Sequence, residues 1–190
     1  SMTAEVSDSG SGVGLGDIWL WSPNLLSNNS FESSLTGWTH DSFTIGNTYP
    51  TPTIAKDGSY WAGISTAYAS GVANREIRQV VAVEPGATYR LSVWVYTDGS
   101  PHTATAALQW KDGAATGSGQ CSTVSSFTAN TSGWQELTGA VTPTGSQLTF
   151  AAKLTWDTSG TGGGGNFDLA KVIKLAGPDS FVAGVATWDD

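Results

Sequence analysis

The chain has 190 residues, of which 13% are charged, while 24 are Gly and nine are Trp. This composition is poor in helix formers and rich in turn residues, so it favours short strands joined by turns in one all-β domain. The net charge of −8 argues against nucleic acid or an anionic membrane as a partner. No run of about 18 apolar residues, the length that spans a bilayer, is present. The single cysteine, Cys121, excludes an internal disulfide and the cysteine clusters of structural zinc sites.

The chain divides into three expected regions. Residues 1–16, "SMTAEVSDSGSGVGLG", have the composition of a flexible tail or linker. Residues 17–176 are expected to form the β-domain. Residues 177–190, which end in "ATWDD", are expected to be a C-terminal extension, either an additional edge strand or a linker to another module.

Within the expected domain, short segments with a period of two are bounded by turn residues, which predicts eight or more β-strands. The segments are 60–66, 75–83, 88–97, 103–110, 121–127, 134–141, 147–156 and 166–175. No segment sustains a helical period. Short strands without crossover helices predict an antiparallel sandwich or barrel, and we favour a β-sandwich of two packed sheets.

Alternation also assigns each side chain to one side of its strand. In 88–97, Leu91, Val93 and Val95 share a side with Tyr89 and are expected in the core, and in 60–66 Tyr60, Ala62 and Ile64 are expected there as well. Small residues between the outward side chains, such as Ser92, Ala107 and Ala151, would leave room for a ligand. The outward side chains with rings, amides or charges are Trp61, Arg90, Trp94, Tyr96, Gln109 and Lys153.

Rings beside amide and charged groups are typical of a sugar-binding surface, because pyranoses have apolar C–H faces and hydroxyls that need polar partners. We expect Trp94 and Tyr96 to form a platform and Trp61 to add a second stacking surface. Gln109 and Arg90 would bind hydroxyls or, as the weaker alternative, a uronate. In the competing interpretation these Trp side chains are core or edge packing, Arg90 and Lys153 only solubilise the rim, and a one-residue bulge would reverse the assignments.

Two further Trp residues are assigned to packing rather than binding. Trp38 follows a glycine turn in "LTGWT", and Trp134 opens a strand in "TSGWQELTGAV". Both are expected in the core or at a hinge.

Several motifs occur in the order seen in a known group of proteins. They are "NLLSNNSFESSLTGW", "GSYWAGIS", "IRQVVAVEPGATYRLSVWV", "LQWKDG", "SGWQELTGAVT" and "NFDLAKV". Over Asn24 to Leu175 the chain resembles carbohydrate-binding modules of families 4, 9 and 22. The resemblance implies a jelly-roll β-sandwich whose concave sheet binds a polysaccharide or oligosaccharide. It also implies secretion, and a role as a monomeric accessory domain of a larger glycoside hydrolase or polysaccharide lyase.

The same resemblance implies a structural calcium ion. Its ligands would be the Glu of the "N-x-x-F-E" motif, here Glu32, and an Asp of the last strand, here Asp168, together with loop carbonyls near Asn28 and Lys56. Calcium takes six to eight oxygen ligands. Where the family often has a second acid after the Asp, this chain has Leu169, so one possible ligand is missing. Alternatively, Glu32 is an ordinary exposed acid and Asp168 caps the end of a strand.

Signals for catalysis are weak. No G-x-S-x-G motif occurs, and His40 and His102 have no Cys or Glu at metal-ligand spacing. A glycosidase needs two facing carboxylates, and none of the six outward side chains is acidic. We therefore predict a non-catalytic binding module. A protein-interaction or phage and cell-surface structural sandwich is the alternative, and a polysaccharide-degrading enzyme is a weaker one.

Overall fold

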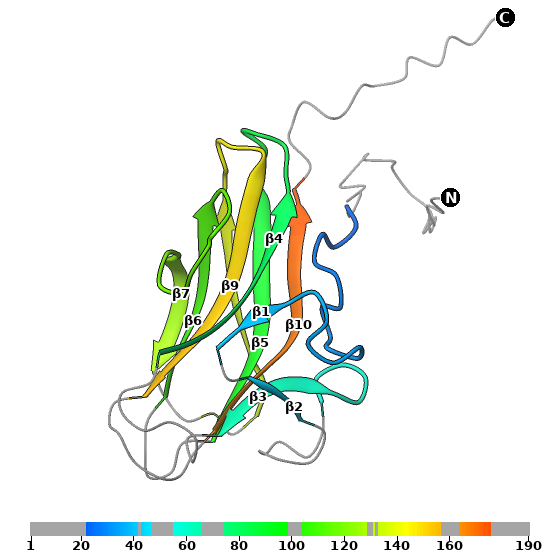
Figure 1. The fold of residues 1–190 in the computed structure, drawn as a ribbon, viewed down its shortest axis with the longest axis vertical. Helices are drawn as coiled ribbons and strands as arrows, with labels where there is room; N and C mark the ends of the chain where they lie inside the picture. Colours follow the sequence, from blue (N-terminus) through cyan, green and yellow to red (C-terminus); the bar gives the residue numbers. More distant parts are fainter. Residues whose placement is uncertain are drawn as a thin grey trace, which may run out of the picture.

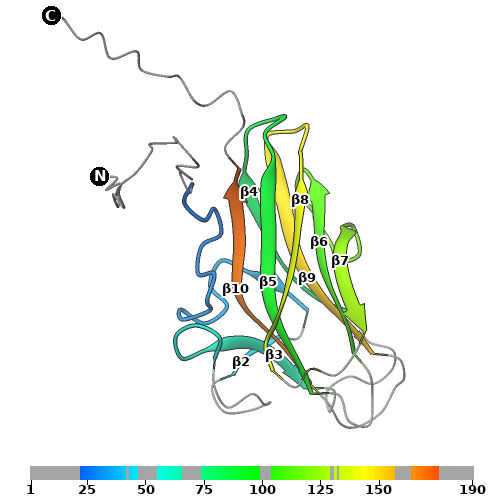
Figure 2. The ribbon, with the colours of Figure 1, turned by 180° about the vertical axis from the view of Figure 1, so that it is seen from behind.

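The computed structural model describes residues 22–41, 43–46, 55–65, 74–98, 104–128, 131, 133–156 and 164–175. In these residues, ten β-strands form two antiparallel five-stranded sheets, which pack face to face (Figures 1 and 2). The predicted antiparallel β-sandwich is confirmed. The described residues contain no helix long and apolar enough to cross a membrane. The predicted tail 1–16 and extension 177–190 lie outside the described residues.

Each sheet combines strands from distant parts of the chain. Sheet 1 has the order β1 (Thr39–His40), β4 (Asn74–Ala82), β9 (Gln147–Trp156), β6 (Ala104–Asp112) and β7 (Ser122–Thr128). Sheet 2 has the order β2 (Thr44–Gly46), β3 (Trp61–Ser65), β10 (Gly164–Lys174), β5 (Tyr89–Asp98) and β8 (Gln135–Val141). Figure 1 looks onto sheet 1, and Figure 2 looks onto sheet 2.

The eight predicted strands correspond to β3 to β10, and their ends agree to within two residues. β1 and β2, with two and three residues, were not predicted, because a segment of this length is too short to show a period of two.

The core lies between the sheets and contains the apolar rows expected from alternation. Leu91, Val93 and Val95 of β5 are buried there together with the apolar row of β9. Trp38 is also in the core, as predicted, with its ring 5.2 Å from that of Phe31 between centroids. One assignment is wrong: Tyr60 lies just before β3 and is 36% exposed, because the strand alternation begins only at Trp61.

The N-terminal part of the described chain closes one edge of the sandwich. Leu25 N–H donates to the Val172 carbonyl of β10 at 2.9 Å. The Asn24 side chain donates to the Ala170 carbonyl and accepts from Val172 N–H, both at 2.9 Å. On sheet 1, the amide of Gln79 binds the same segment through Ser27. The segment therefore ties β10 to β4 and fixes the chain leading to Glu32.

Candidate functional site

The six side chains predicted to form one outward surface lie on opposite faces of the sandwich. Arg90, Trp94 and Tyr96 belong to β5 in sheet 2, whereas Gln109 of β6 and Lys153 of β9 belong to sheet 1. Because the sheets pack through their inner faces, the outward side chains of one sheet point away from those of the other. The prediction of a single shared face is wrong, since alternation assigns a side of a strand and not the sheet that contains it.

Trp61 does not offer a stacking surface, because it is 0% exposed. Its side is opposite to that of Ala62 and Ile64, as predicted, and it lies outside the main core cluster. The indole packs against glycines: a Cβ on Gly46 would lie 2.3 Å from Trp61 Nε1, and one on Gly63 would lie 3.3 Å away. The glycines create the space that buries this ring, so the interpretation as packing is correct for Trp61.

The outer face of sheet 2 brings the other three sheet 2 residues together. Arg90, Ser92, Trp94 and Tyr96 follow one another on alternate positions of β5, so the row from Arg90 to Tyr96 extends about 20 Å. Arg90 is exposed, and Trp94 and Tyr96 are half-buried. We call this surface, defined by the row and its neighbours on β8 and β10, the β5 face.

A β-bulge in β10 adds a basic residue to the β5 face. The register shifts between Asp168 and Lys171, and Leu169 between them has a positive φ of 47°. Strict alternation would place Asp168 and Lys171 on opposite sides of the strand. The bulge instead pairs Asp168 with Trp94 and Lys171 with Ser92. Strand alternation alone does not predict Lys171 on this face, because a bulge leaves no mark on the hydrophobic period.

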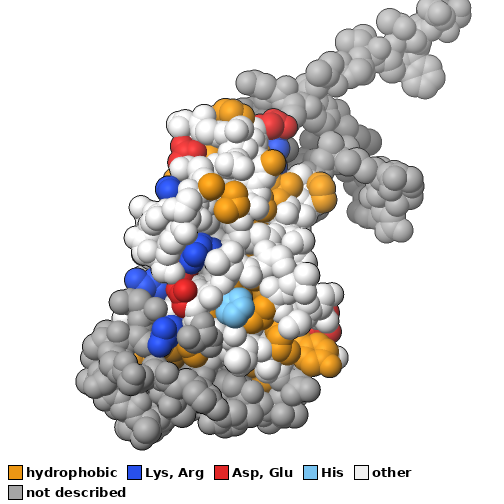
Figure 3. Space-filling view, in the orientation of Figure 1, with side chains coloured by type: hydrophobic (Ala, Val, Ile, Leu, Met, Phe, Trp, Pro, Cys, Tyr) orange, Lys and Arg blue, Asp and Glu red, His pale blue; other side chains and the backbone are white. Residues whose placement is uncertain are grey.

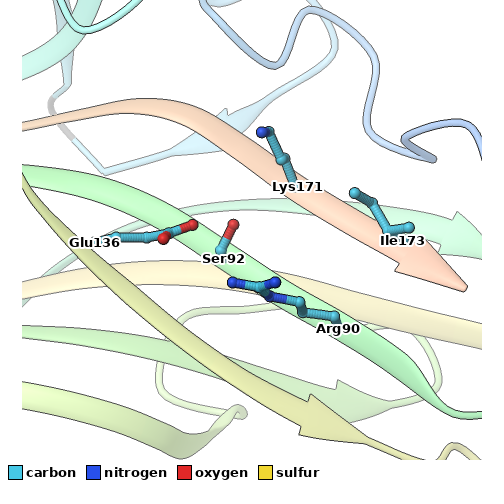
Figure 4. A pocket seen from close by; sticks show the side chains of 5 residues that line it. All are labelled: Arg90, Ser92, Glu136, Lys171 and Ile173. Atoms are coloured by element: carbon cyan, nitrogen blue, oxygen red, sulfur yellow. The ribbon is translucent and has the colours of Figure 1, made fainter. Parts of the chain in front are cut away.

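A shallow pocket lies beside Trp94, with a volume of about 120 Å³. Sites that enclose a small molecule usually have roughly 300–1,000 Å³, so this pocket can receive a substituent of a larger ligand but cannot enclose a sugar chain. Figure 4 shows the guanidinium of Arg90 and the carboxylate of Glu136 approaching Ser92 from two sides. The lining residues are Arg90, Ser92, Glu136, Lys171 and Ile173.

A second aromatic pair continues the β5 face. The ring of Tyr96 packs edge-on against Trp134, with centroids 6.0 Å apart and planes at 63°. Trp134 is half-buried and lies just before β8, so it contributes to this face rather than to the core or a hinge alone. Trp134 lies two residues before Glu136, so alternation places both side chains on the same side of the strand, and this spacing could have assigned Trp134 to the β5 face.

The face of the Trp94 ring is in contact with a cation. Lys56 Nζ lies 3.7 Å from the ring centroid. At an exposed site such a cation–π contact contributes about 0.5–1 kcal/mol. Lys56 is exposed and belongs to the loop that precedes β3, so its ammonium can leave the ring at a small cost. A ligand on Trp94 therefore either displaces Lys56 or binds to it.

Gln109 and Lys153 lie on the outer face of sheet 1, beside a buried ion pair between Glu76 and Arg78, 3.3 Å apart. A loop covers this pair: Arg78 donates to Ser118 Oγ at 3.0 Å, and Gly119 N–H donates to Glu76 at 3.1 Å. Figure 3 shows charged side chains of both signs gathered on this face among mostly polar neighbours. It is more covered and less aromatic than the β5 face among the described residues.

Asp168, one of the two predicted metal ligands, is fully buried next to Trp94. Its Oδ2 accepts hydrogen bonds from Lys56 N–H at 2.8 Å and Asp57 N–H at 3.0 Å, and its Oδ1 accepts one from Leu169 N–H. Burial raises the pKa of this carboxyl to about 7, since the charged form is disfavoured away from water, although the three N–H donors act in the opposite direction.

Glu32 holds the other end of the same loop. Its Oε1 accepts hydrogen bonds from Ser59 N–H at 2.9 Å and Tyr60 N–H at 2.8 Å. Gly58 lies against the carboxylate, with φ of 67°, and a Cβ at this position would be 2.5 Å from Glu32 Cδ. Glu32 and Asp168 thus clamp residues 56–60 by backbone amides, a role that neither alternative interpretation from sequence included.

The donor set fits calcium in part. A buried carboxylate with a raised pKa gains from a nearby cation, and the amides occupy only Oε1 of Glu32. Asn28 fits poorly, because its Oδ1 accepts from Ser33 and its carbonyl accepts from Trp38 Nε1. The described residues contain no group of three or more His, Cys, Asp or Glu placed to hold a metal. A calcium ion held by Glu32 and Asp168 would need further oxygens from carbonyls or water.

A β-sandwich that presents rings and hydrogen-bonding side chains on one sheet face has the architecture of a sugar-binding module. Residues 23–159 match the family described as "Carbohydrate binding domain", which comprises carbohydrate-binding modules of families 4 and 9. This match spans more than half of the chain, so the chain belongs to that family. No curated protein sequence matches the chain.

Solved structures share the fold. One is TmCBM61 in complex with beta-1,4-galactotriose, with 18% identity, a TM-score of 0.55, and coverage of 80% of this chain and 99% of that chain. A second is the CBM22-1 xylan-binding domain of Paenibacillus barcinonensis Xyn10C, with 18% identity, a TM-score of 0.54, and coverage of 82% and 96%. A third contains the CBM22-1 and GH10 modules of Clostridium thermocellum xylanase 10B, with 14% identity, a TM-score of 0.50, and coverage of 82% and 29%. These identities establish the fold alone.

Proposed function

We propose that this carbohydrate-binding module binds a polysaccharide chain along its β5 face. The observation that carries the proposal is the assembly of Trp94, Tyr96 and Trp134 with Arg90 and Glu136 on one accessible sheet face. Family membership supports sugar binding, and we propose that the module itself is non-catalytic. Family membership also disfavours the alternative of a protein-interaction or structural sandwich.

The aromatic side chains and the pocket of the β5 face would bind different parts of the sugar. Apolar C–H faces of the sugar rings pack on the aromatic side chains, which removes apolar surface from water at roughly 25 cal/mol per Å². Hydroxyl groups bind Arg90, Ser92 and Glu136 in the pocket. A sugar that stacks on Trp94 displaces the Lys56 ammonium at a cost of about 0.5–1 kcal/mol. The row along β5 extends about 20 Å, which suits a chain rather than a single sugar.

We propose further that the module acts outside the cell as a monomeric part of a larger protein, where it brings an attached enzyme to its substrate. One structure with the same fold joins a CBM22-1 module to a GH10 module and contains xylohexaose. Soluble xylan and β-1,4-galactan, which correspond to the ligands named for two similar structures, are therefore the first neutral polysaccharides to test.

We also propose that Glu32 and Asp168 hold a structural calcium ion. The ion would supply the positive charge that the buried Asp168 carboxylate lacks, and it would fasten the 56–60 loop to the last strand. Glu32 and Asp168 would themselves position the 56–60 loop, and this loop places Lys56 on the Trp94 ring.

Affinity electrophoresis of the purified chain in native gels that contain single polysaccharides tests the proposal. For a polysaccharide that retards the chain, Trp94→Ala and Tyr96→Ala are compared with Gln109→Ala and Lys153→Ala, which change the opposite face of the sandwich. Loss of one platform is expected to weaken binding about ten- to a hundredfold, because it removes about 1–3 kcal/mol of apolar burial.

The melting temperature of each variant separates binding from folding. Weak binding by the β5 variants at near-native melting temperatures supports the β5 face. If only the Gln109 and Lys153 variants lose binding, the outer face of sheet 1 is the binding face. If Trp94→Ala unfolds the chain, Arg90→Ala provides the same comparison at an exposed position.

A further inference from the structure

We infer that the β5 face selects an acidic polysaccharide, whose sugars carry carboxylate groups, and that Arg90, Lys171 and Lys56 determine this selectivity. The inference rests on the proposed function, because it names the ligand class of the same face. It goes beyond that function, since a polysaccharide module could equally select a neutral chain.

The distribution of charge is the first support. The chain has a net charge of −8 and only eight Lys and Arg residues, yet two of them, Arg90 and Lys171, line the pocket of the β5 face and a third, Lys56, lies over the Trp94 ring. The ion pairs within the described residues are Arg78–Glu76 and Lys174–Glu84. None of Arg90, Lys171 and Lys56 is in an ion pair in the described part of the chain, and in the pocket the two cations Arg90 and Lys171 outnumber the one acid, Glu136.

The geometry of the pocket is the second support. Arg90 Nε donates to Thr138 Oγ1 at 3.1 Å, which fixes the guanidinium plane and leaves its terminal N–H groups for a ligand. A fixed guanidinium matches a carboxylate with two parallel hydrogen bonds. Lys171 lies diagonally across the strands from Arg90, because Lys171 pairs with Ser92 and Arg90 pairs with Ile173. A volume of about 120 Å³ admits a carboxylate more readily than a sugar ring.

Lys56 extends the positive charge to the aromatic part of the face. Its backbone N–H is bound by the buried Asp168, so the loop holds the ammonium close to the ring of Trp94. A neutral sugar that stacks on Trp94 must displace this ammonium. With an acidic sugar, the Lys56 ammonium can stay and pair with the sugar carboxylate. Lys56 then strengthens binding instead of weakening it.

Glu136 provides the most discriminating test. It lines the same pocket as Arg90 and Lys171. If the pocket binds a carboxylate, Glu136 repels the ligand, so Glu136→Gln strengthens binding about two- to fivefold, the usual range for an exposed charge pair. If the pocket binds only hydroxyls, Glu136 is an acceptor and the same substitution weakens binding.

The experiment measures affinity of the full chain, by isothermal titration, for polygalacturonate, alginate and glucuronoxylan, each paired with its carboxyl-reduced counterpart. At least one acidic polymer is expected to bind ten or more times tighter than its reduced form, because a hydrogen bond to a charged group is worth about 1.5–3 kcal/mol. Arg90→Gln and Lys171→Gln are each expected to lower the affinity for the acidic polymer about tenfold and to change the affinity for the reduced polymer little. Lys153→Gln, the same loss of charge on the opposite face, is expected to change neither.

Each outcome is decisive. Equal affinity for acidic and reduced polymers, or weaker binding of the acidic polymer by Glu136→Gln, overturns the inference. If only neutral chains bind and Trp94→Ala removes that binding, the proposed function stands and the acidic selectivity is wrong. If no polysaccharide binds, or if binding is lost only in the sheet 1 variants, both proposals fall.

Discussion

The buried Asp168 carboxyl is expected to make the free energy of unfolding depend on pH. Its pKa is raised by burial from 3.8 to about 7. The folded chain therefore binds this proton more tightly than the unfolded chain, and the stabilisation is complete below about pH 4 and is lost as the pH rises through about 7. A shift of about three pH units corresponds to roughly 4 kcal/mol at most, at 1.36 kcal/mol for each unit.

The assay is urea unfolding in the presence of a chelator at pH 5 and pH 8. The free energy of unfolding is expected to be about 2–3 kcal/mol smaller at pH 8, where Asp168 is charged and has no cation, because it falls by about 1.36 kcal/mol for each pH unit from pH 5 to about pH 7. In Asp168→Asn, which cannot ionise, most of this difference should disappear. Calcium added at pH 8 should restore stability to the parent chain only. A chelated parent chain that is equally stable at both pH values, or an unchanged difference in Asp168→Asn, would refute the reasoning.

Three further outcomes are expected. Glu32→Ala should lower the melting temperature, because Ser59 N–H and Tyr60 N–H lose their acceptor, and should abolish any effect of a chelator on melting. Trp38→Ala should cost about 3–5 kcal/mol in urea unfolding, because it leaves a cavity beside Phe31, and a smaller loss would show that the site collapses. The Cys121 thiol, whose pKa burial raises to about 11, should react slowly with iodoacetamide at pH 8 and faster as the pH approaches 11, whereas rapid alkylation of the native chain at pH 8 would contradict this.

The fold was readable from sequence because its strands have one apolar side. In β9, five apolar residues at alternate positions occupy the core without a break, so both the strand and its orientation were predicted. Pairing is a non-local property, and nothing in the period shows that β5 belongs to one sheet and β9 to the other. For this reason the outward residues were identified correctly as outward and combined wrongly into one surface.

Two residues of the β5 face were not predicted because irregular backbone brings them there. Lys171 reaches the β5 face through a bulge, and Lys56 reaches it from a loop that is far from β5 in sequence. Trp61 was predicted to be on the binding surface but is buried. Its position in the alternation is outward, but alternation does not show the glycines that bury the ring. Alternation describes single strands, whereas a binding face depends on irregular backbone and on packing between distant segments.

The loop before β3 connects the proposed metal site to the proposed binding face. Its backbone is fixed by the carboxylates of Asp168 and Glu32, and its first fixed residue, Lys56, places an ammonium on Trp94. A change at Asp168 is therefore expected to move a charge at the proposed binding face, although Asp168 itself is fully buried. Glu32→Ala removes the acceptor of the Ser59 and Tyr60 N–H groups and frees the far end of the loop, while Asp168 still accepts the hydrogen bond from Lys56 N–H. Binding of a polysaccharide should therefore depend more on Asp168 than on Glu32, even where both substitutions destabilise the fold equally.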